Sequence, residues 1–185
     1  MGARSDEIAS RRAFLGHGLM LAFVGFGRRI AGQASRVLRY RPLASPTVIP
    51  LADVSTLWRG RQFTAEAVTL STAATPNQPI RVAGMVVRTA DDRYAAVCLR
   101  CPHELCDVDY VSDPRRLPQE IVEEIGHPIK EPVYVCPCHN STFRVEDGER
   151  LAGPAPRGLY RFRVTGVTAT AVEIAEVEED VLIFN

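Results

Sequence analysis

The sequence has no net charge, no internal repeat and no glycine-rich phosphate loop. Its 22 Lys and Arg residues balance 22 Asp and Glu residues over 185 positions, and no nucleophile is paired with a general base. The charge is unevenly placed, because residues 1–41 carry a net +6 and residues 42–185 a net −6. An acidic main body argues against nucleic-acid binding. The chemical signal lies instead in five Cys and four His residues.

Long apolar runs are also scarce, and the one that stands out covers residues 13–27, interrupted by His17. Ser10-Arg11-Arg12 before it is typical of a twin-arginine export signal. An ordinary arginine pair at the start of a membrane helix is the alternative. Both interpretations keep the arginines inside and send the rest of the chain across the membrane.

The run is short for a membrane anchor, with 15 residues against the roughly 20 that a spanning helix needs. Arg28 and Arg29 after it can reach the far interface with their long side chains. Small residues in Gly32-Gln33-Ala34 also fit a cleavage site, so a removed signal peptide is the alternative. We expect residues 1–12 to stay in the cytoplasm and residues 13–30 to remain as a transmembrane helix.

The rest of the chain has the composition of a β domain that follows a linker. Small residues and prolines in residues 31–47 predict a linker. Asp91-Asp92-Arg93 between two apolar stretches predicts a hairpin turn, and residues 118–126, which end at Gly126, predict a short helix. The acids Glu176, Glu178, Glu179 and Asp180 predict a solvated edge or tail. Strands are expected at 48–51, 63–70, 80–87, 94–99, 133–135, 142–145, 160–164 and 171–177.

Two short segments combine cysteine and histidine at close spacing: Cys101-Pro-His103 followed by Cys106, and Cys136-Pro-Cys138-His139. Thiolates with imidazoles suit zinc or iron–sulfur chemistry. Spacing alone also permits structural zinc, held by two Cys and two His or by four Cys including Cys98. A zinc site of four Cys would leave both histidines without a role. A zinc site of two Cys and two His would leave Cys106 and Cys138 without a role. A Rieske [2Fe–2S] centre uses two Cys on one iron and two His on the other.

At these segments the sequence resembles the Rieske iron–sulfur protein family. The resemblance implies one [2Fe–2S] cluster per chain, with Cys101 and Cys136 on one iron and His103 and His139 on the other. It also gives the two histidines the catalytic role of proton transfer. Cys98 is then a small buried side chain rather than a ligand.

The resemblance reaches beyond the ligands. Cys106 and Cys138 occupy the positions of a disulfide in the quinol-oxidising branch of the family. Gly153-Pro154-Ala155-Pro156 matches the proline loop that covers the cluster. Ser141 matches a serine that donates to a bridging sulfur, and Phe143 stands where high-potential members have a tyrosine.

The implied fold is mainly β, a Rieske-type antiparallel β-sandwich over residues 48–185 preceded by one transmembrane helix. Its small cluster-binding subdomain has loops at 98–106 and 136–143 with an insertion at 107–132. We expect the insertion either to contact a partner subunit or to be a tolerated surface loop. Glu104 and Leu105 replace the Leu-Gly of many quinol-oxidising members.

The resemblance implies the Rieske subunit of a bc-type quinol:cytochrome c oxidoreductase. Such a subunit takes one electron from quinol and passes it to a c-type haem, and it assembles with a cytochrome b subunit in a dimeric complex. The expected location is the bacterial inner membrane, with a single span and the head on the periplasmic side. The alternative is the Rieske subunit of an arsenite-oxidase-type periplasmic molybdenum enzyme. A soluble Rieske ferredoxin of an oxygenase system is a third possibility, which should lack the export signal and the disulfide.

Overall fold

The structure is a computed structural model that describes residues 38–70 and 76–181. The predicted twin-arginine segment 1–12, the predicted transmembrane helix 13–30 and the first part of the predicted linker 31–47 lie outside the described residues. Among the described residues, no helix is long and apolar enough to span a membrane.

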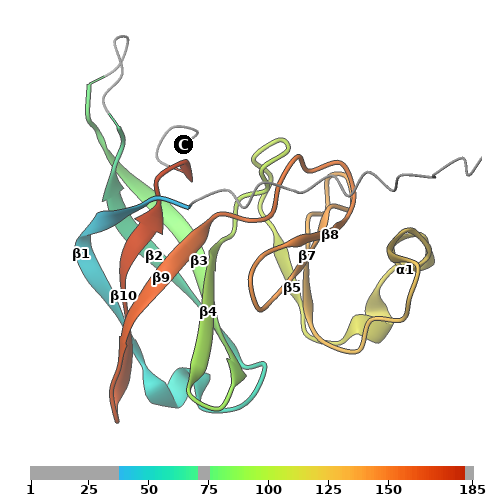
Figure 1. Cartoon of the computed structure of the whole chain (residues 1–185), viewed down its shortest axis with the longest axis horizontal. Coiled ribbons are helices and arrows are strands. Elements are labelled where there is room, and N and C mark those ends of the chain that lie inside the picture. Colours follow the sequence, from blue (N-terminus) through green and yellow to red (C-terminus); the bar gives the residue numbers. More distant parts are fainter. Residues whose placement is uncertain (1–37, 71–75, 182–185) are drawn as a thin grey trace, which may run out of the picture. The chain divides into compact units, whose positions relative to one another are not determined.

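The described residues form ten strands in two antiparallel sheets (Figure 1). The larger sheet has the order β1-β10-β9-β4-β3-β2, and the smaller has the order β5-β6-β7-β8. One α-helix and two short 3₁₀ helices (η1 and η2) lie in the connections. The elements are β1 (Tyr40–Pro50), η1 (Leu51–Val54), β2 (Gly60–Val68), β3 (Pro79–Ala90), β4 (Arg93–Cys98), β5 (Asp109–Val111), η2 (Pro114–Arg116), α1 (Gln119–Ile125), β6 (Val133–Val135), β7 (Thr142–Arg144), β8 (Arg150–Ala152), β9 (Arg161–Val167) and β10 (Ala171–Glu178).

The larger sheet curls until its two outer strands, β1 and β2, lie against each other. It is therefore a nearly closed barrel. The mainly β, antiparallel prediction is confirmed, although this sheet closes on itself where the sequence led us to expect a sandwich. The hairpin turn is also confirmed, since β3 pairs with β4 across Asp91 and Asp92.

Strand β1 begins at Tyr40, before the predicted domain start at Val48, and it pairs with β10 from its first residue. Residues 40–47 belong to the barrel and not to a linker. Two prolines, Pro42 and Pro46, made this stretch resemble a linker. The pairing with β10 is irregular between Pro42 and Thr47, which is where a β-strand tolerates proline.

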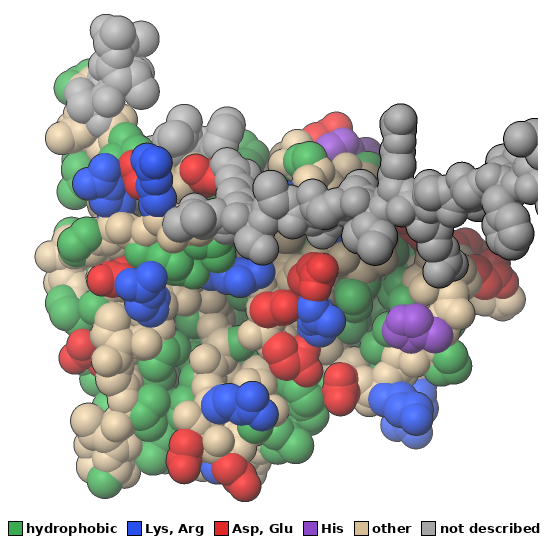
Figure 2. All heavy atoms as spheres, in the orientation of Figure 1, with side chains coloured by type: hydrophobic (Ala, Val, Ile, Leu, Met, Phe, Trp, Pro, Cys, Tyr) green, Lys and Arg blue, Asp and Glu red, His purple; other side chains and the backbone are tan. Residues whose placement is uncertain are grey.

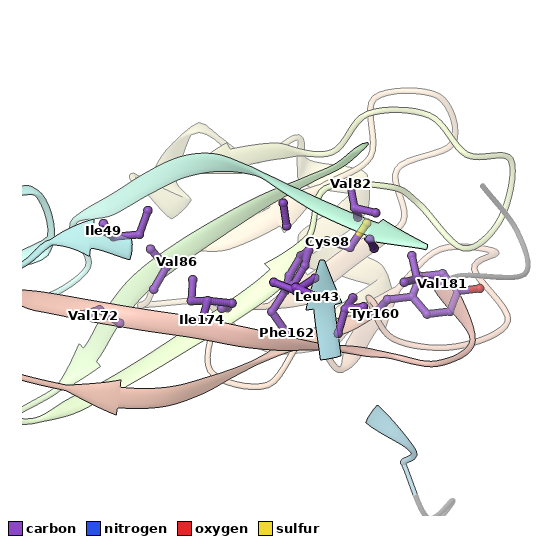
Figure 3. Close-up of a cluster of buried hydrophobic side chains, with 14 of the residues drawn as sticks. Leu43, Ile49, Val82, Val86, Cys98, Tyr160, Phe162, Val172, Ile174 and Val181 are labelled. Atoms are coloured by element: carbon purple, nitrogen blue, oxygen red, sulfur yellow. The ribbon is translucent and has the colours of Figure 1, made fainter. Parts of the chain in front are cut away.

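Alternation along β4 creates two cores. Ala96 and Cys98 face the barrel interior, which Figure 3 shows as a cluster of side chains from several strands. Val97 and Leu99 face outward and pack against the smaller sheet in a second core that includes Cys101 and Cys136. Successive side chains of a strand point to opposite faces, so one strand supports the barrel and also carries the metal-binding region.

The two segments that combine cysteine and histidine, Cys101–Cys106 (the first box) and Cys136–Ser141 (the second box), are separated by a segment that contains more secondary structure than a surface loop. Asp109–Val111 forms β5, one of the two edge strands of the smaller sheet. The predicted helix is confirmed as α1, and Gly126 ends it in the left-handed conformation with φ 81°. The first residues of segment 107–132, which was predicted to be an insertion, therefore belong to the sheet.

Candidate metal centre

The two predicted cluster loops each contain a backbone turn, and the two turns have the same hydrogen-bond pattern. In the first loop, the Cys101 amide donates to the Cys106 carbonyl and the Leu105 amide donates back to the Cys101 carbonyl. In the second, the Cys136 amide donates to the Ser141 carbonyl and the Asn140 amide to the Cys136 carbonyl. The fourth residue after each cysteine, Leu105 or Asn140, has a positive φ, 57° or 58°.

The strands bring these turns together. The first loop follows β4, and the second joins β6 to β7. The Cys106–Cys138 disulfide links them across a sequence separation of 32, which confirms the predicted pairing. Disulfides form and persist in oxidising compartments.

The four expected ligands divide into a buried pair and an exposed pair. The Cys101 and Cys136 side chains are 1% and 2% exposed, and both are free thiols. The His103 and His139 rings are exposed, with centroids 5.0 Å apart and planes at 81°. Figure 2 shows histidine side chains at the surface near the top of the view. The predicted ligands therefore converge, with sulfur inside and imidazole at the surface.

The buried thiols fit a metal cofactor on electrostatic grounds. Burial raises the pKa of the Cys101 thiol, and the adjoining Cys136 thiol raises it further. Two thiolates side by side in an apolar core need positive charge for compensation. A bound metal ion supplies that charge and deprotonates its thiol ligands.

The four-cysteine zinc alternative does not fit the structure. Cys98 points into the barrel core, away from the side of β4 on which Cys101 lies, and Cys138 is consumed by the disulfide. Burial raises the pKa of the Cys98 thiol to about 12, so this thiol is an inert core side chain at neutral pH. The expectation that Cys98 is not a ligand is consistent with this position.

Glu104 lies at the exposed pair, and the sequence marked it only as a departure from the family pattern. Its Oε2 is 3.7 Å from Nδ1 of His139. His103, Glu104 and His139 form a group whose ligand atoms all lie within 4.8 Å of one another. The exposed tip therefore carries a negative charge beside its two imidazoles.

The proline loop at residues 153–156 packs onto the second box. The Ala155 amide donates to Oγ of Ser141 at 3.1 Å, while Pro154 is exposed. Gly153 has φ +83°, and a Cβ there would lie 2.4 Å from Cα of Ser141. Only glycine allows this approach. Ser141 Oγ is the acceptor in this bond, so its hydroxyl proton stays free to donate to another atom. The predicted hydrogen bond from Ser141 to a bridging sulfur of the cluster requires such a free proton.

Phe143 lies inside the second core with Cys101 and Cys136 and is completely buried. Its cross-strand neighbour Tyr134 is also completely buried. Among the described residues, the Tyr134 hydroxyl is the buried side-chain polar atom without a hydrogen-bond partner. This could not be predicted from the sequence, because the apolar pattern of β6 does not show which atoms lie next to a tyrosine hydroxyl in the folded chain.

A large cavity lies away from the Cys/His loops. It has a volume of about 740 Å³ and is lined by Arg93 and Tyr94 at the start of β4 and by residues 164–167 of β9. The first cluster loop follows the other end of β4. The histidines of the two cluster loops therefore lie at an exposed tip and do not line this cavity.

Comparison with known families identifies this architecture. A family model for the Rieske [2Fe-2S] domain matches residues 48–165. The chain belongs to this family, and it binds a [2Fe–2S] cluster. A search of curated proteins finds no match. The match includes the four expected ligands, Cys101, His103, Cys136 and His139, and their individual roles as ligands stay a prediction.

Proposed function

We propose that the chain is the Rieske subunit of a bc-type quinol:cytochrome c oxidoreductase. The observation that carries the proposal is the Cys106–Cys138 disulfide, which ties the two cluster loops beneath an exposed histidine pair. Its two cysteines occupy the positions of the disulfide that quinol-oxidising members of the family have. The basic N-terminal segment and the apolar run at residues 13–27 support a membrane-anchored head on the periplasmic side.

In this proposal the buried cysteines and the exposed histidines have different roles. When bound, the cluster accepts one electron at a potential raised by its two neutral imidazole ligands. His103 or His139 hydrogen-bonds the quinol hydroxyl through a solvent-facing ring nitrogen and takes its proton. Burial of Cys101 and Cys136 keeps water from the sulfur side. The exposed tip then contacts a c-type cytochrome, while a cytochrome b subunit holds the quinol.

A second candidate is the Rieske subunit of an arsenite-oxidase-type molybdenum enzyme. Two features favour it: the apolar run is short for an anchor, and Glu104 places a carboxylate at the tip. A carboxylate is costly to bury in an apolar quinol site. The disulfide argues against the third possibility, a soluble ferredoxin of an oxygenase system.

Purification of the native assembly from membranes separates the candidates. Membranes are washed with carbonate and then solubilised in mild detergent, and the chain is captured by an affinity tag at its C-terminus. The bc-type proposal expects retention in washed membranes and a co-purifying b-type haem seen by reduced-minus-oxidised spectra. Release by the wash together with stoichiometric molybdenum would establish the second candidate.

A further inference from the structure

The backbone of Gly153 in the proline loop is held from both sides by charged side chains. Its amide donates to Oε1 of Glu124 at 2.8 Å, and its carbonyl accepts from Nη1 of Arg150 at 2.6 Å. Arg150 is a near neighbour in β8. Glu124 lies on α1, in the segment between the two Cys/His boxes. The inserted helix is therefore bonded to the loop expected to cover the cluster.

Gly153 lies in direct contact with the second box. A Cβ at this residue would meet Cα, N and Oγ of Ser141 at 2.4–2.9 Å, so the two backbones lie in close contact. The Ser141 carbonyl in turn accepts the amide of Cys136 at 2.8 Å. A continuous path of contacts runs from Glu124 through Gly153 and Ser141 to an expected cluster ligand.

The helix α1, which carries Glu124, is itself fixed in position by packing and by its C-terminal cap. Ile121 on α1 is 1% exposed and anchors the helix to the domain. At its C-terminus the Gly126 amide donates to the Val122 carbonyl in a left-handed cap. Such a cap satisfies carbonyls of the last turn. Glu124, on the last turn, therefore projects from an anchored and capped element that packs beside β8.

We propose that Glu124 is a positioning residue for the cluster. Its carboxylate holds Gly153 and with it the proline loop against Ser141, and it thereby sets the environment of the second box. In this proposal α1, which lies between the two boxes, supports the proline loop that is expected to cover the cluster. This role belongs to the family's cluster and is the same in a bc-type complex and in a molybdenum enzyme.

Hydrogen exchange provides a direct test, because Pro154 and Pro156 have no amide hydrogen. Residues 153–156 therefore have two exchanging amides, and these are the donors to Glu124 and to Ser141. Exchange is followed on the intact, cluster-loaded protein by mass spectrometry with fragmentation that resolves single amides. Three variants are compared with wild type: Glu124→Ala, Glu124→Gln and, as a matched control, Glu123→Ala.

The control is matched because Glu123 lies on the same helix and accepts a bond from Gln119 Nε2 at 2.6 Å. Its loss removes the same charge and weakens the same helix without touching Gly153. Glu124→Ala should speed exchange of both the Gly153 and the Ala155 amides by about fivefold, the value of an ordinary net hydrogen bond. Glu124→Gln should stay close to wild type, because an amide oxygen still accepts the bond. Glu123→Ala should match wild type.

The second readout is the EPR spectrum of the reduced cluster together with the rate of iron loss to a chelator. Glu124→Ala should shift the g values and speed iron loss, and Glu124→Gln should restore both. Faster exchange at Gly153 alone, with Ala155 and the EPR spectrum unchanged, would overturn the proposal, since the contact would then be local. Equal effects in Glu124→Ala and Glu123→Ala would overturn it as well, because they would assign the effect to the helix as a whole.

Discussion

At the scale of single residues, three aromatic side chains line the smaller sheet beneath the cluster loops. Tyr110, Tyr134 and Phe143 are cross-strand neighbours on β5, β6 and β7. The Tyr110 hydroxyl donates to the Trp58 carbonyl at 2.7 Å, and burial raises its pKa to about 12. Burial also raises the pKa of Tyr134. Both hydroxyls are therefore protonated donors at neutral pH, but of the two only that of Tyr110 has a hydrogen-bond partner among the described residues.

Phe143 should keep the reduction potential below that of relatives with a tyrosine there. In Phe143→Tyr the new hydroxyl can donate to the sulfur of Cys101 or Cys136, which share its core. Reduction adds negative charge, so a donor to sulfur stabilises the reduced state and raises the potential. An ordinary hydrogen bond corresponds to about 30–60 mV for a one-electron couple. Protein-film voltammetry at a pH below the histidine titrations measures the shift. An unchanged midpoint with an intact EPR signal would mean that position 143 does not face the ligand sulfurs.

Tyr134→Phe should leave stability unchanged or raise it by up to about 1 kcal/mol, because it removes a buried hydroxyl that has no hydrogen-bond partner among the described residues. Tyr110→Phe serves as the matched control. It should destabilise the protein by about 1 kcal/mol, since the Trp58 carbonyl loses its donor. Urea unfolding of the two variants, both loaded with cluster, measures the difference. Equal destabilisation would show that the Tyr134 hydroxyl has an essential partner.

At the scale of elements, the cluster region consists of two similar turns joined covalently. Each turn closes by a pair of backbone bonds around its cysteine, and neither turn belongs to a strand ladder. The disulfide supplies the connection that the sheet does not provide. The histidines are exposed, while the backbone of each turn is held by its own hydrogen bonds and by the disulfide.

Replacing both disulfide cysteines, Cys106→Ser with Cys138→Ser, should lower stability by about 3–4 kcal/mol, the chain-entropy value for a loop of this length. Guanidinium unfolding measures the loss. Alkylation of unfolded wild-type protein without reductant gives an independent check. It should label Cys98 and leave Cys106 and Cys138 unlabelled. Labelling of either disulfide cysteine in protein kept from reductants would contradict the bond.

At the scale of the whole molecule, an ion-pair network connects the proline loop to the barrel. Arg157, next after the loop, pairs with Glu178 at the end of β10 and with Asp180 at 3.0 Å. It also stacks on Tyr160 with its guanidinium carbon 4.3 Å from the ring centroid. Glu178 is 1% exposed and accepts the Arg161 amide as well. The expectation that this acid lies on a solvated edge is therefore wrong.

Arg157→Gln should destabilise the protein by about 2–4 kcal/mol, because it leaves the buried Glu178 carboxylate without its cation. The double variant with Glu178→Gln should recover a large part of this loss, since no buried charge is left unpaired. Thermal or urea unfolding of wild type, both single variants and the double variant gives the coupling free energy. A double variant as unstable as the sum of the singles would contradict the pairing.

The sequence by itself determined the chemistry and much of the local structure. Close spacing of Cys101 with His103 and of Cys136 with His139 indicated the metal-binding boxes, since a loop of a few residues brings such ligands together without help from the fold. The turn at Asp91-Asp92 and the helix that ends at Gly126 were likewise predictable, because conformational preference in a turn or cap is local.

Contacts between distant segments decided the rest. Residues 40–47 form part of a strand because they pair with β10, which lies more than a hundred positions further along the chain. Glu178 was buried because Arg157 reaches it, and Glu124 met the proline loop because α1 packs beside β8. A charged or proline-containing stretch has the same local pattern whether it meets a partner or water. Its burial depends on which segments the folded chain brings against it, and only the tertiary structure specifies that.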